Sequence, residues 1–455
     1  MRRRGSAIVG RIVTPWPSLS LGVTLLALGL GLPVAAAAGT ERVSVTSAGG
    51  QAEGMSLDPS ISASGRFVAF TSLAANLVAG DTNGYPDVFV HDRRTGRTTR
   101  VSVSSRGRQG NRGSYAAAIS GSGRHVAFCS YASNLAGRDR LPRGLQDYEL
   151  EPYRDVFVHD RATGRTRMVS RGSRRTLHDP MRTPRAGSCA PSISDDGGSV
   201  AYLLERTRIP VSDIDRPLHV MLWSAAGARR RQLDRDARGR SANGDAAAPA
   251  ISGNGRFVAF NSGATNLVRG DTNGTWDTFV VARSGRRMRR VSVTPVGGQV
   301  VGESIGAVDV SRTGRLVAFR SYARELHPKA QDAFADGYVK DRRTGVVDLV
   351  SLGTAATEAN GSLLDLSLSP DGRFAAFSTD AANLVPGETD ASSDVFLRDR
   401  SLGRIAQVTL EEPSAGLGSS EADVARGGVV AYASYSSTVV PGDTNDAADV
   451  FVRTP

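Results

Sequence analysis

The sequence predicts an all-β protein: a seven-bladed β-propeller of four-stranded antiparallel blades, closed by an N-terminal strand that completes the last blade. Three observations predict it. A unit whose clearest line is Gly-Arg-Phe-Val-Ala-Phe returns seven times along the chain, and a period of this size indicates a repeat architecture. Within the unit, apolar residues alternate or run continuously, as in strands, and show no sustained helical period. The last copy lacks a strand that the N-terminal part of the chain repeats.

The first copy shows how one unit forms four strands. Residues 57–62 lead into a turn at Gly65, and residues 66–71 are apolar on both sides, which is typical of a strand buried on both faces. After a loop, residues 87–91 are again apolar throughout. Residues 98–103 alternate, so they predict an outer strand with one exposed face. The turn glycines of the seven copies are Gly65, Gly123, Gly197, Gly255, Gly314, Gly372 and Gly427.

The two ends of the chain predict how the ring closes. The seventh copy stops at Pro455, directly after its third strand. Residues 42–45 read Arg-Val-Ser-Val and repeat the fourth strands at 100–103 and 290–293. We expect this N-terminal strand to pair with the last blade, because the pairing removes exposed strand edges.

Residues 1–38 have the pattern of an export signal. They contain four arginines, an apolar stretch over 19–34 and a small-residue cleavage site at 35–38. An uncleaved membrane anchor is the alternative, but the stretch is short and glycine-rich for a span of about 20 residues. We therefore predict a signal peptide over 1–38 and a propeller over 39–455, with no transmembrane segment after cleavage. We expect a monomer that is secreted or held in the periplasm or cell envelope.

The charge of the chain argues against a nucleic-acid partner. The formal net charge is +11, and four of these charges lie in residues 1–38. Binding to nucleic acid needs a basic stripe with stacking aromatic residues. Aromatic residues make up only 6% of the chain, and most fall in the buried strand motifs. We therefore interpret the arginines as a solvated surface and expect no nucleic-acid partner.

One line of the repeat carries a family resemblance. Residues 368–377 read Leu-Ser-Pro-Asp-Gly-Arg-Phe-Ala-Ala-Phe, with relatives at 62–70 and 252–260. This line resembles the WD40-like PD40 repeat of TolB-type β-propellers, and the resemblance covers essentially all of 39–455. It implies the propeller fold and little about function, since the family holds binding modules, envelope scaffolds and propellers fused to hydrolase domains. The chain shows neither TolB's separate N-terminal domain nor a C-terminal hydrolase domain, so their particular roles are not carried over.

An acidic loop precedes the third strand in four of the copies. It places Asp, Asn or Glu oxygens at positions 1, 3 and 7 around a turn, which suits a hard cation such as calcium. The alternative is an Asx turn, in which these side chains bond nearby backbone amides. The bidentate Glu of a complete EF-hand loop is missing, and both interpretations stay open. The candidate calcium ligands are Asp81, Asn83, Asp87, Asp271, Asn273, Asp277, Glu388, Asp390, Asp394, Asp443, Asn445 and Asp449.

The two cysteines and the longest unit fall in the same region. We expect Cys129 and Cys189 at the same rim of adjacent blades, where an exported protein favours a disulfide; two buried free thiols are the alternative. The second unit carries insertions within 137–155 and 170–197. Loops on a rigid scaffold often bind ligands, although insertions of this kind also arise as neutral length variation.

Catalytic motifs are weak in this sequence. Residues 302–306 match Gly-x-Ser-x-Gly, but that motif needs a strand-to-helix turn, and we predict no catalytic residue there. The predicted function is therefore a non-enzymatic binding or scaffold module for a protein, peptide or envelope glycan on the loop face, with calcium as its candidate cofactor. The alternative is a secreted hydrolase or lyase that uses carboxylates around the propeller channel, such as Asp58 or Asp365.

Overall fold

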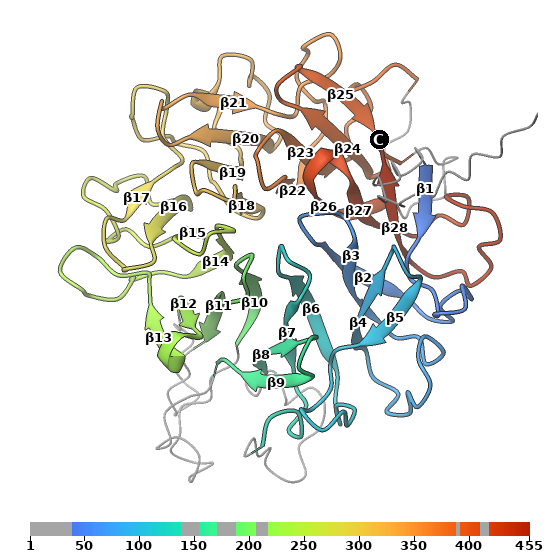
Figure 1. Ribbon diagram of the computed structural model, residues 1–455. Helices are drawn as coiled ribbons and strands as arrows, with labels where there is room; N and C mark the ends of the chain where they lie inside the picture. Colours follow the sequence, from blue (N-terminus) through green and yellow to red (C-terminus); the bar gives the residue numbers. More distant parts are fainter. Residues whose placement is uncertain (1–38, 138–153, 171–187, 206–216, 388–391, 410–417) are drawn as a thin grey trace, which may run out of the picture. The chain divides into compact units, whose positions relative to one another are not determined.

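The computed structural model describes residues 39–455, except 138–153, 171–187, 206–216, 388–391 and 410–417. The predicted export signal therefore lies outside the described residues. The described strands form seven four-stranded sheets around a common axis (Figure 1). No helix in the described ranges has the length and apolar character needed to cross a membrane. The predicted all-β, seven-bladed fold is confirmed.

Each blade starts beside the ring axis and runs outward (Figure 1). The innermost strands of blades 1 to 7 are β2 (Ser56–Ile61), β6 (Ser114–Ile119), β10 (Ser188–Ile193), β14 (Ala246–Ile251), β18 (Val308–Val310), β22 (Leu363–Leu368) and β26 (Ser419–Val424). The second strands are β3 (Phe67–Ser72), β7 (His125–Ser130), β11 (Ser199–Glu205), β15 (Phe257–Ser262), β19 (Leu316–Ser321), β23 (Phe374–Thr379) and β27 (Val430–Ser434).

The outer half of each blade holds the third and fourth strands. The third strands are β4 (Asp87–Asp92), β8 (Asp155–Asp160), β12 (Leu218–Ser224), β16 (Asp277–Ala282), β20 (Asp336–Asp341), β24 (Asp394–Asp399) and β28 (Asp449–Thr454). The outermost strands are β5 (Arg97–Arg100), β9 (Arg165–Met168), β13 (Arg229–Gln232), β17 (Arg289–Arg290), β21 (Val347–Leu349), β25 (Arg404–Gln407) and, in blade 7, β1 (Gly39–Arg42). The described residues also include the short 3-10 helices η4 (Ala226–Ala228), η5 (Arg324–Leu326) and η6 (Arg426–Gly428).

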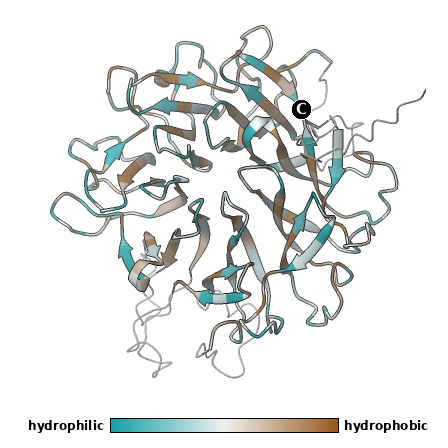
Figure 2. Ribbon diagram, viewed as in Figure 1, coloured by the Kyte–Doolittle hydropathy of each residue, from teal (hydrophilic) through white to brown (hydrophobic). Residues whose placement is uncertain are grey.

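The core lies between neighbouring blades, on the second and third strands. These strands are the apolar ones, while polar residues gather on the outermost strands (Figure 2). In blade 1, the rings of Phe70 and Phe89 face each other across the two strands at 5.9 Å and are fully buried. Five other blades repeat this pair. Strands that are buried on both faces read as continuous apolar runs, which explains why these two strands were the clearest in the sequence.

The turn glycines are needed for their backbone conformation, and several of them also for space. Gly123 has φ 72°, in the left-handed region that disfavours a side chain. A Cβ there would also lie 2.2 Å from the Phe67 ring of the preceding blade. All seven predicted turn glycines have φ between 66° and 76°. At Gly123, Gly197, Gly314 and Gly372, the absence of a side chain therefore lets one blade approach the next.

The predicted closure of the ring is confirmed, with a shift in position. β1 pairs with β28 in an antiparallel register that sets Gly39 opposite Thr454 and Arg42 opposite Phe451. The strand thus ends at Arg42, where the prediction had it begin. The chain turns toward blade 1 beyond that point, and Val45 forms an isolated bridge with Gln51.

The innermost strands are bent by bulges. In β2 the register shifts between Leu57 and Ser60, and Asp58 between them has φ 53°. Glu421 in β26 takes the same conformation, with φ 60°. A bulge re-aims the side chain of its residue, so these bulges decide where acidic side chains point near the axis.

Candidate functional site

In blades 1, 4 and 7, the predicted calcium loops contain an arginine from the outermost strand. In blade 1, Arg100 Nη1 lies 3.1 Å from Asp81 Oδ1 and 3.2 Å from Asp87 Oδ2. The equivalent pairs are those of Arg290 with Asp271 and Asp277, and of Arg42 with Asp443 and Asp449. A guanidinium therefore supplies the positive charge that the calcium hypothesis assigned to a metal.

The same loops also contain the turns of the alternative interpretation. Asn83 Oδ1 accepts the N–H of Tyr85 at 2.9 Å, and Asn445 Oδ1 accepts that of Ala447 at 3.1 Å. These contacts are Asx turns that lead into the third strand. The remaining candidate ligands are similarly engaged or outside the described residues: Asn273 Nδ2 donates to Val300 O, Asp394 accepts from Thr409, and Glu388 and Asp390 are not described.

Blade 5 replaces this arrangement with three carboxylates. Leu349 occupies the position that Arg100 holds in blade 1. In each blade this residue pairs with the aromatic residue of the third strand, Tyr338 in blade 5 and Phe89 in blade 1. Glu358 occupies the position of Gln109 in blade 1. Gln109 forms an isolated β-bridge with Val103, and Glu358 forms the equivalent bridge with Leu352. Ligand oxygens of Asp332, Asp336 and Glu358 all lie within 4.8 Å of one another. By composition and spacing, these three residues could hold a metal ion.

The blade-5 cluster is stabilised by hydrogen bonds rather than by ion pairs: the N–H of Gln331 donates to Glu358 Oε1, that of Phe334 to Asp332 Oδ1, and the hydroxyl of Ser351 to Asp336 Oδ1. Burial raises the pKa of Asp336 to about 7, and the negative charges of Glu358 and Asp332 add to the rise. Within the described ranges, no arginine or lysine forms an ion pair with any of the three. The repeat pattern in the sequence does not point to this cluster, because blade 5 lacks the Asp-Thr-Asn line. Aligning Leu349 with Arg100 and Glu358 with Gln109 would have found it.

A second group of carboxylates lies on the innermost strands of three adjacent blades. Asp365, Glu421 and Asp58 belong to blades 6, 7 and 1. The N–H of Glu421 donates to Asp365 Oδ2 at 2.5 Å, and the N–H of Asp58 donates to Glu421 Oε2 at 2.7 Å. The N–H of Ala116 in blade 2 then donates to Asp58 Oδ2 at 3.2 Å. The sequence pointed to Asp58 and Asp365, which the structure brings together, and it missed Glu421 between them.

Glu421 and Asp58 each have one carboxyl oxygen that accepts no hydrogen bond from the described residues. Asp365 is saturated, since the N–H and hydroxyl of Ser378 donate to its two oxygens at 3.1 and 2.7 Å. Glu421 Oε1 and Asp58 Oδ1 make no hydrogen bond to another described residue. Burial raises the pKa of Glu421 to about 7, and the charges of Asp58 and Asp365 add to the rise. A protonated acid beside a second carboxylate is an acid–base pair.

A deeper pair of aspartates is hydrogen-bonded to backbone N–H groups of neighbouring blades, and Asp423 Oδ1 also accepts the hydroxyl of Ser367 at 2.8 Å. Asp309 Oδ2 accepts the N–H of Leu368 in the next blade at 2.7 Å, and Asp423 Oδ2 accepts that of Ile61 at 2.8 Å. Burial raises the pKa of Asp309 to about 7, and the charge of Asp423 contributes. These carboxylates tie neighbouring innermost strands together.

The remaining sequence predictions have mixed outcomes. Cys129 in β7 and Cys189 in β10 form a disulfide that joins blades 2 and 3, as predicted.

Ser304 of the Gly-x-Ser-x-Gly match is fully buried and donates to Ser321 Oγ at 2.8 Å, so it is not placed as a nucleophile. Most of the inserted segments fall in 138–153 and 171–187, outside the described residues, and their binding role stays a prediction.

Comparison with known proteins identifies the fold. No protein-family profile matches the chain, and no curated protein matches it significantly. An oligogalacturonate lyase solved in complex with manganese aligns with a TM-score of 0.52 at 12% identity, over 92% of this chain and 94% of its own. An acylaminoacyl peptidase from Pyrococcus horikoshii aligns with a TM-score of 0.51 at 10% identity, over 88% of this chain and 51% of its own. A TolB structure from Agrobacterium tumefaciens aligns with a TM-score of 0.37 at 16% identity, over 65% of this chain and 80% of its own.

These comparisons contradict the expectation of a non-enzymatic binding or scaffold module. An oligogalacturonate lyase and an acylaminoacyl peptidase, both named as enzymes, align with TM-scores above 0.5. That expectation had rested on the lack of catalytic motifs in the sequence. Motifs record residues that are close along the chain, whereas the carboxylates near this axis come from strands hundreds of residues apart.

Proposed function

We propose that this chain is an exported hydrolase that cleaves a glycosidic bond beside the ring axis. The observation that carries the proposal is the pair formed by Glu421 and Asp58. Their strands hold one carboxyl whose pKa lies near 7 beside a second carboxylate, and each has an oxygen unused by the fold. Glycosidases use two carboxyl groups with different protonation states in this way.

Each carboxyl has a distinct role in this mechanism. Glu421 Oε1 donates a proton to the glycosidic oxygen, so the departing sugar leaves as an alcohol. Asp58 Oδ1 acts on the other side of the bond, either on the anomeric carbon or on the attacking water. Asp365 is a positioning residue, because it accepts the N–H of Glu421 and both of its oxygens are already hydrogen-bonded within the fold.

Electrostatics favour hydrolysis of a neutral saccharide. The structurally similar lyase acts on oligogalacturonate, as its name states, and so supports a saccharide as substrate. Elimination from a uronate needs positive charge to hold the sugar carboxylate, whereas this site presents three acidic side chains on adjacent strands. Like charges repel at short range, so a neutral sugar suits the site better.

We further propose that blade 5 holds one divalent cation of the calcium type through Asp332, Asp336 and Glu358. Three carboxylates match the oxygen ligands that calcium prefers. The support comes from the sister blades, where an arginine sits among the equivalent oxygens. The cation would supply the charge that Leu349 lacks and would stabilise blade 5, with no part in the reaction.

The test compares residues 39–455 with the Glu421→Gln and Asp58→Asn variants. Neutral cello-, xylo- and malto-oligosaccharides are assayed for new reducing ends, and oligogalacturonate is assayed for the ultraviolet absorbance of an unsaturated product. We expect reducing ends from one neutral series, lost in both variants. Unsaturated product alone would replace hydrolysis with elimination, and activity retained by both variants would remove this site from the reaction.

A further inference from the structure

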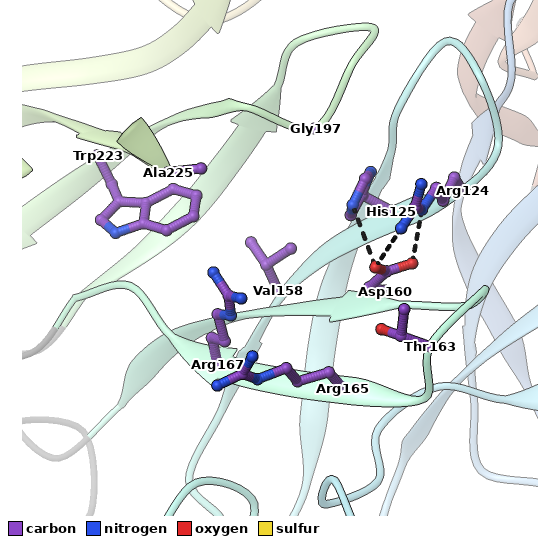
Figure 3. A pocket seen from close by; sticks show the side chains of 10 residues that line it. All are labelled: Arg124, His125, Val158, Asp160, Thr163, Arg165, Arg167, Gly197, Trp223 and Ala225. Atoms are coloured by element: carbon purple, nitrogen blue, oxygen red, sulfur yellow. Dashed lines mark hydrogen bonds and ion pairs between the residues drawn. The ribbon is translucent and has the colours of Figure 1, made fainter. Parts of the chain in front are cut away.

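A separate pocket lies between blades 2 and 3, with a volume of 350 Å³ (Figure 3). Its lining includes Gly197, in the turn between β10 and β11, and Thr163, in the turn between β8 and β9. In an antiparallel blade these two turns share one face. The pocket therefore opens on the face opposite to the loops between second and third strands.

The pocket exists because blade 3 lacks a repeated arginine. In blade 2, Arg161 stacks 4.4 Å over the Phe67 ring of blade 1, and its Nη1 donates to Gly123 O at 2.6 Å. The same position is held by Arg93, Arg161, Arg283, Arg342 and Arg400. Blade 3 has Ala225 there, as the matching backbone hydrogen bond to Gly198 shows. The space that the missing side chain would fill, above His125, is left open.

The pocket carries a net positive charge. Arg124 is neutralised by Asp160, which accepts two of its N–H groups at 2.8 and 2.7 Å (Figure 3). Arg165 and Arg167 lie two residues apart on β9, so they project from the same face of the strand. Both are exposed, and neither forms an ion pair with another described residue. Two guanidinium groups are therefore free to bind an anion.

Trp223 adds a small apolar area to the pocket wall. Its side chain lies across the pocket from the arginines (Figure 3), and only 4% of the residue is exposed. An indole plane packs well against the C–H face of a sugar ring. Guanidinium groups bind carboxylates through paired hydrogen bonds. A volume of 350 Å³ is at the small end of ligand sites and suits one or two sugar rings.

We propose that this pocket binds a carboxylated sugar, a hexuronate, with its ring against Trp223 and its carboxylate on Arg165 and Arg167. The site is distinct from the Glu421–Asp58 pair and bears the opposite charge. The inference stands on the pocket alone and does not require the hydrolase to be active.

Tryptophan fluorescence reports on this site directly. Without residues 1–38, Trp223 and Trp276 are the remaining tryptophans, so a Trp276→Phe background leaves Trp223 as the reporter. The ligands are D-galacturonate and D-galactose, which differ at C6 as carboxylate and alcohol. We expect a saturable change with galacturonate and none with galactose. Equal responses to both sugars, or no response, would overturn the proposal.

Variants then separate the sugar site from adventitious anion binding. We expect Arg165→Gln with Arg167→Gln to weaken galacturonate at least tenfold, and Ala225→Arg to abolish binding by restoring the repeated arginine. Arg97→Gln, at the matching position of blade 1, is the control and should bind normally, as should Glu421→Gln. Inorganic phosphate that competes as well as galacturonate would reduce the pocket to an adventitious anion site, and unaltered binding by Ala225→Arg would place the sugar elsewhere.

Discussion

The backbone N–H of Asp58 donates a 2.7 Å hydrogen bond to Oε2 of Glu421, although the two residues are 363 positions apart in the chain. This bond joins blade 1 to blade 7 at the innermost strands, while β1 joins the ends of the chain at the outer edge of blade 7. Ring closure thus does two things. It completes the last blade, and it brings Asp58 beside Glu421, which forms the candidate catalytic pair.

The pH dependence of hydrolysis should report Glu421. Its pKa of about 7 means that it holds its proton below neutrality and loses it above, so activity should fall as pH rises through 7. Glu421→Gln should reduce the rate by about 10²- to 10⁴-fold, the usual contribution of a general acid. Asp365→Asn removes one negative neighbour and should shift the falling limb to lower pH. Initial rates measured across pH 5 to 9 test this. If activity falls at the same pH in Asp365→Asn as in the native protein, Glu421 is not the acid.

Calcium should stabilise blade 5 through its three carboxylates. For a site saturated at 100 times its Kd, binding adds about 2.7 kcal/mol to the free energy of unfolding, visible as a higher Tm. Asp336→Asn and Glu358→Gln should lose the effect. Leu349→Arg should also lose it while raising the Tm of the calcium-free protein, because the arginine copies blade 1. A calcium response that persists in all three variants would exclude this cluster.

Removing an arginine from a sister blade should have the opposite result. Arg100→Leu leaves Asp81 and Asp87 buried without a positive partner, and loss of one partner from a buried pair costs about 3 kcal/mol or more. The variant should unfold at lower denaturant and gain a calcium-dependent Tm that the parent blade does not have. Calorimetric titration should find one more site in Arg100→Leu than in the native chain. If the number of calcium sites is unchanged, the geometry of the loop prevents binding even when the arginine is absent.

The disulfide should contribute to stability through the unfolded chain. Cys129 and Cys189 are separated by 60 residues, and closing a loop of that size stabilises a fold by about 4 kcal/mol in the chain-entropy estimate. Replacing both cysteines by serine should lower the midpoint of urea unfolding. The native protein should show the same drop in reductant, and the double variant should be indifferent to it. A native midpoint that reductant leaves unchanged would contradict this.

Asp309 should make stability depend on pH. Its pKa is raised in the fold to about 7 from an ordinary value near 3.8, so the native state binds more protons than the unfolded chain between those values. Its contribution is therefore complete below about pH 4 and is lost as pH rises through 7. Asp309→Asn can still accept the N–H of Leu368 and should flatten this slope. Tm values at pH 5 and pH 8 check it, and equal slopes in the two proteins would contradict it.

The repeat predicted the fold because the interactions that define a blade are local. The apolar runs at Phe67–Ser72 and Asp87–Asp92 and the turn glycine Gly65 lie within one unit. Seven copies of such a pattern confirm one another. The acidic loops could also be recognised in the sequence. The choice between a calcium site and an Asx turn stayed open, because the sequence does not show which group a carboxylate binds. The partner in blade 1, Arg100, follows Asp87 by 13 positions and reads in the sequence as a surface residue.

The sequence by itself determined the number of blades, the order of their strands and the closure of the ring by an N-terminal strand, because these follow from periodic hydrophobicity and tight turns. Only the tertiary structure decided the chemistry. It set Glu421 between Asp58 and Asp365, placed arginines among the carboxylates of three blades and left blade 5 without one, and opened a pocket where Ala225 replaces an arginine. Each of these features depends on which residues of different strands or blades meet when the ring closes, and sequence spacing carries no record of those contacts.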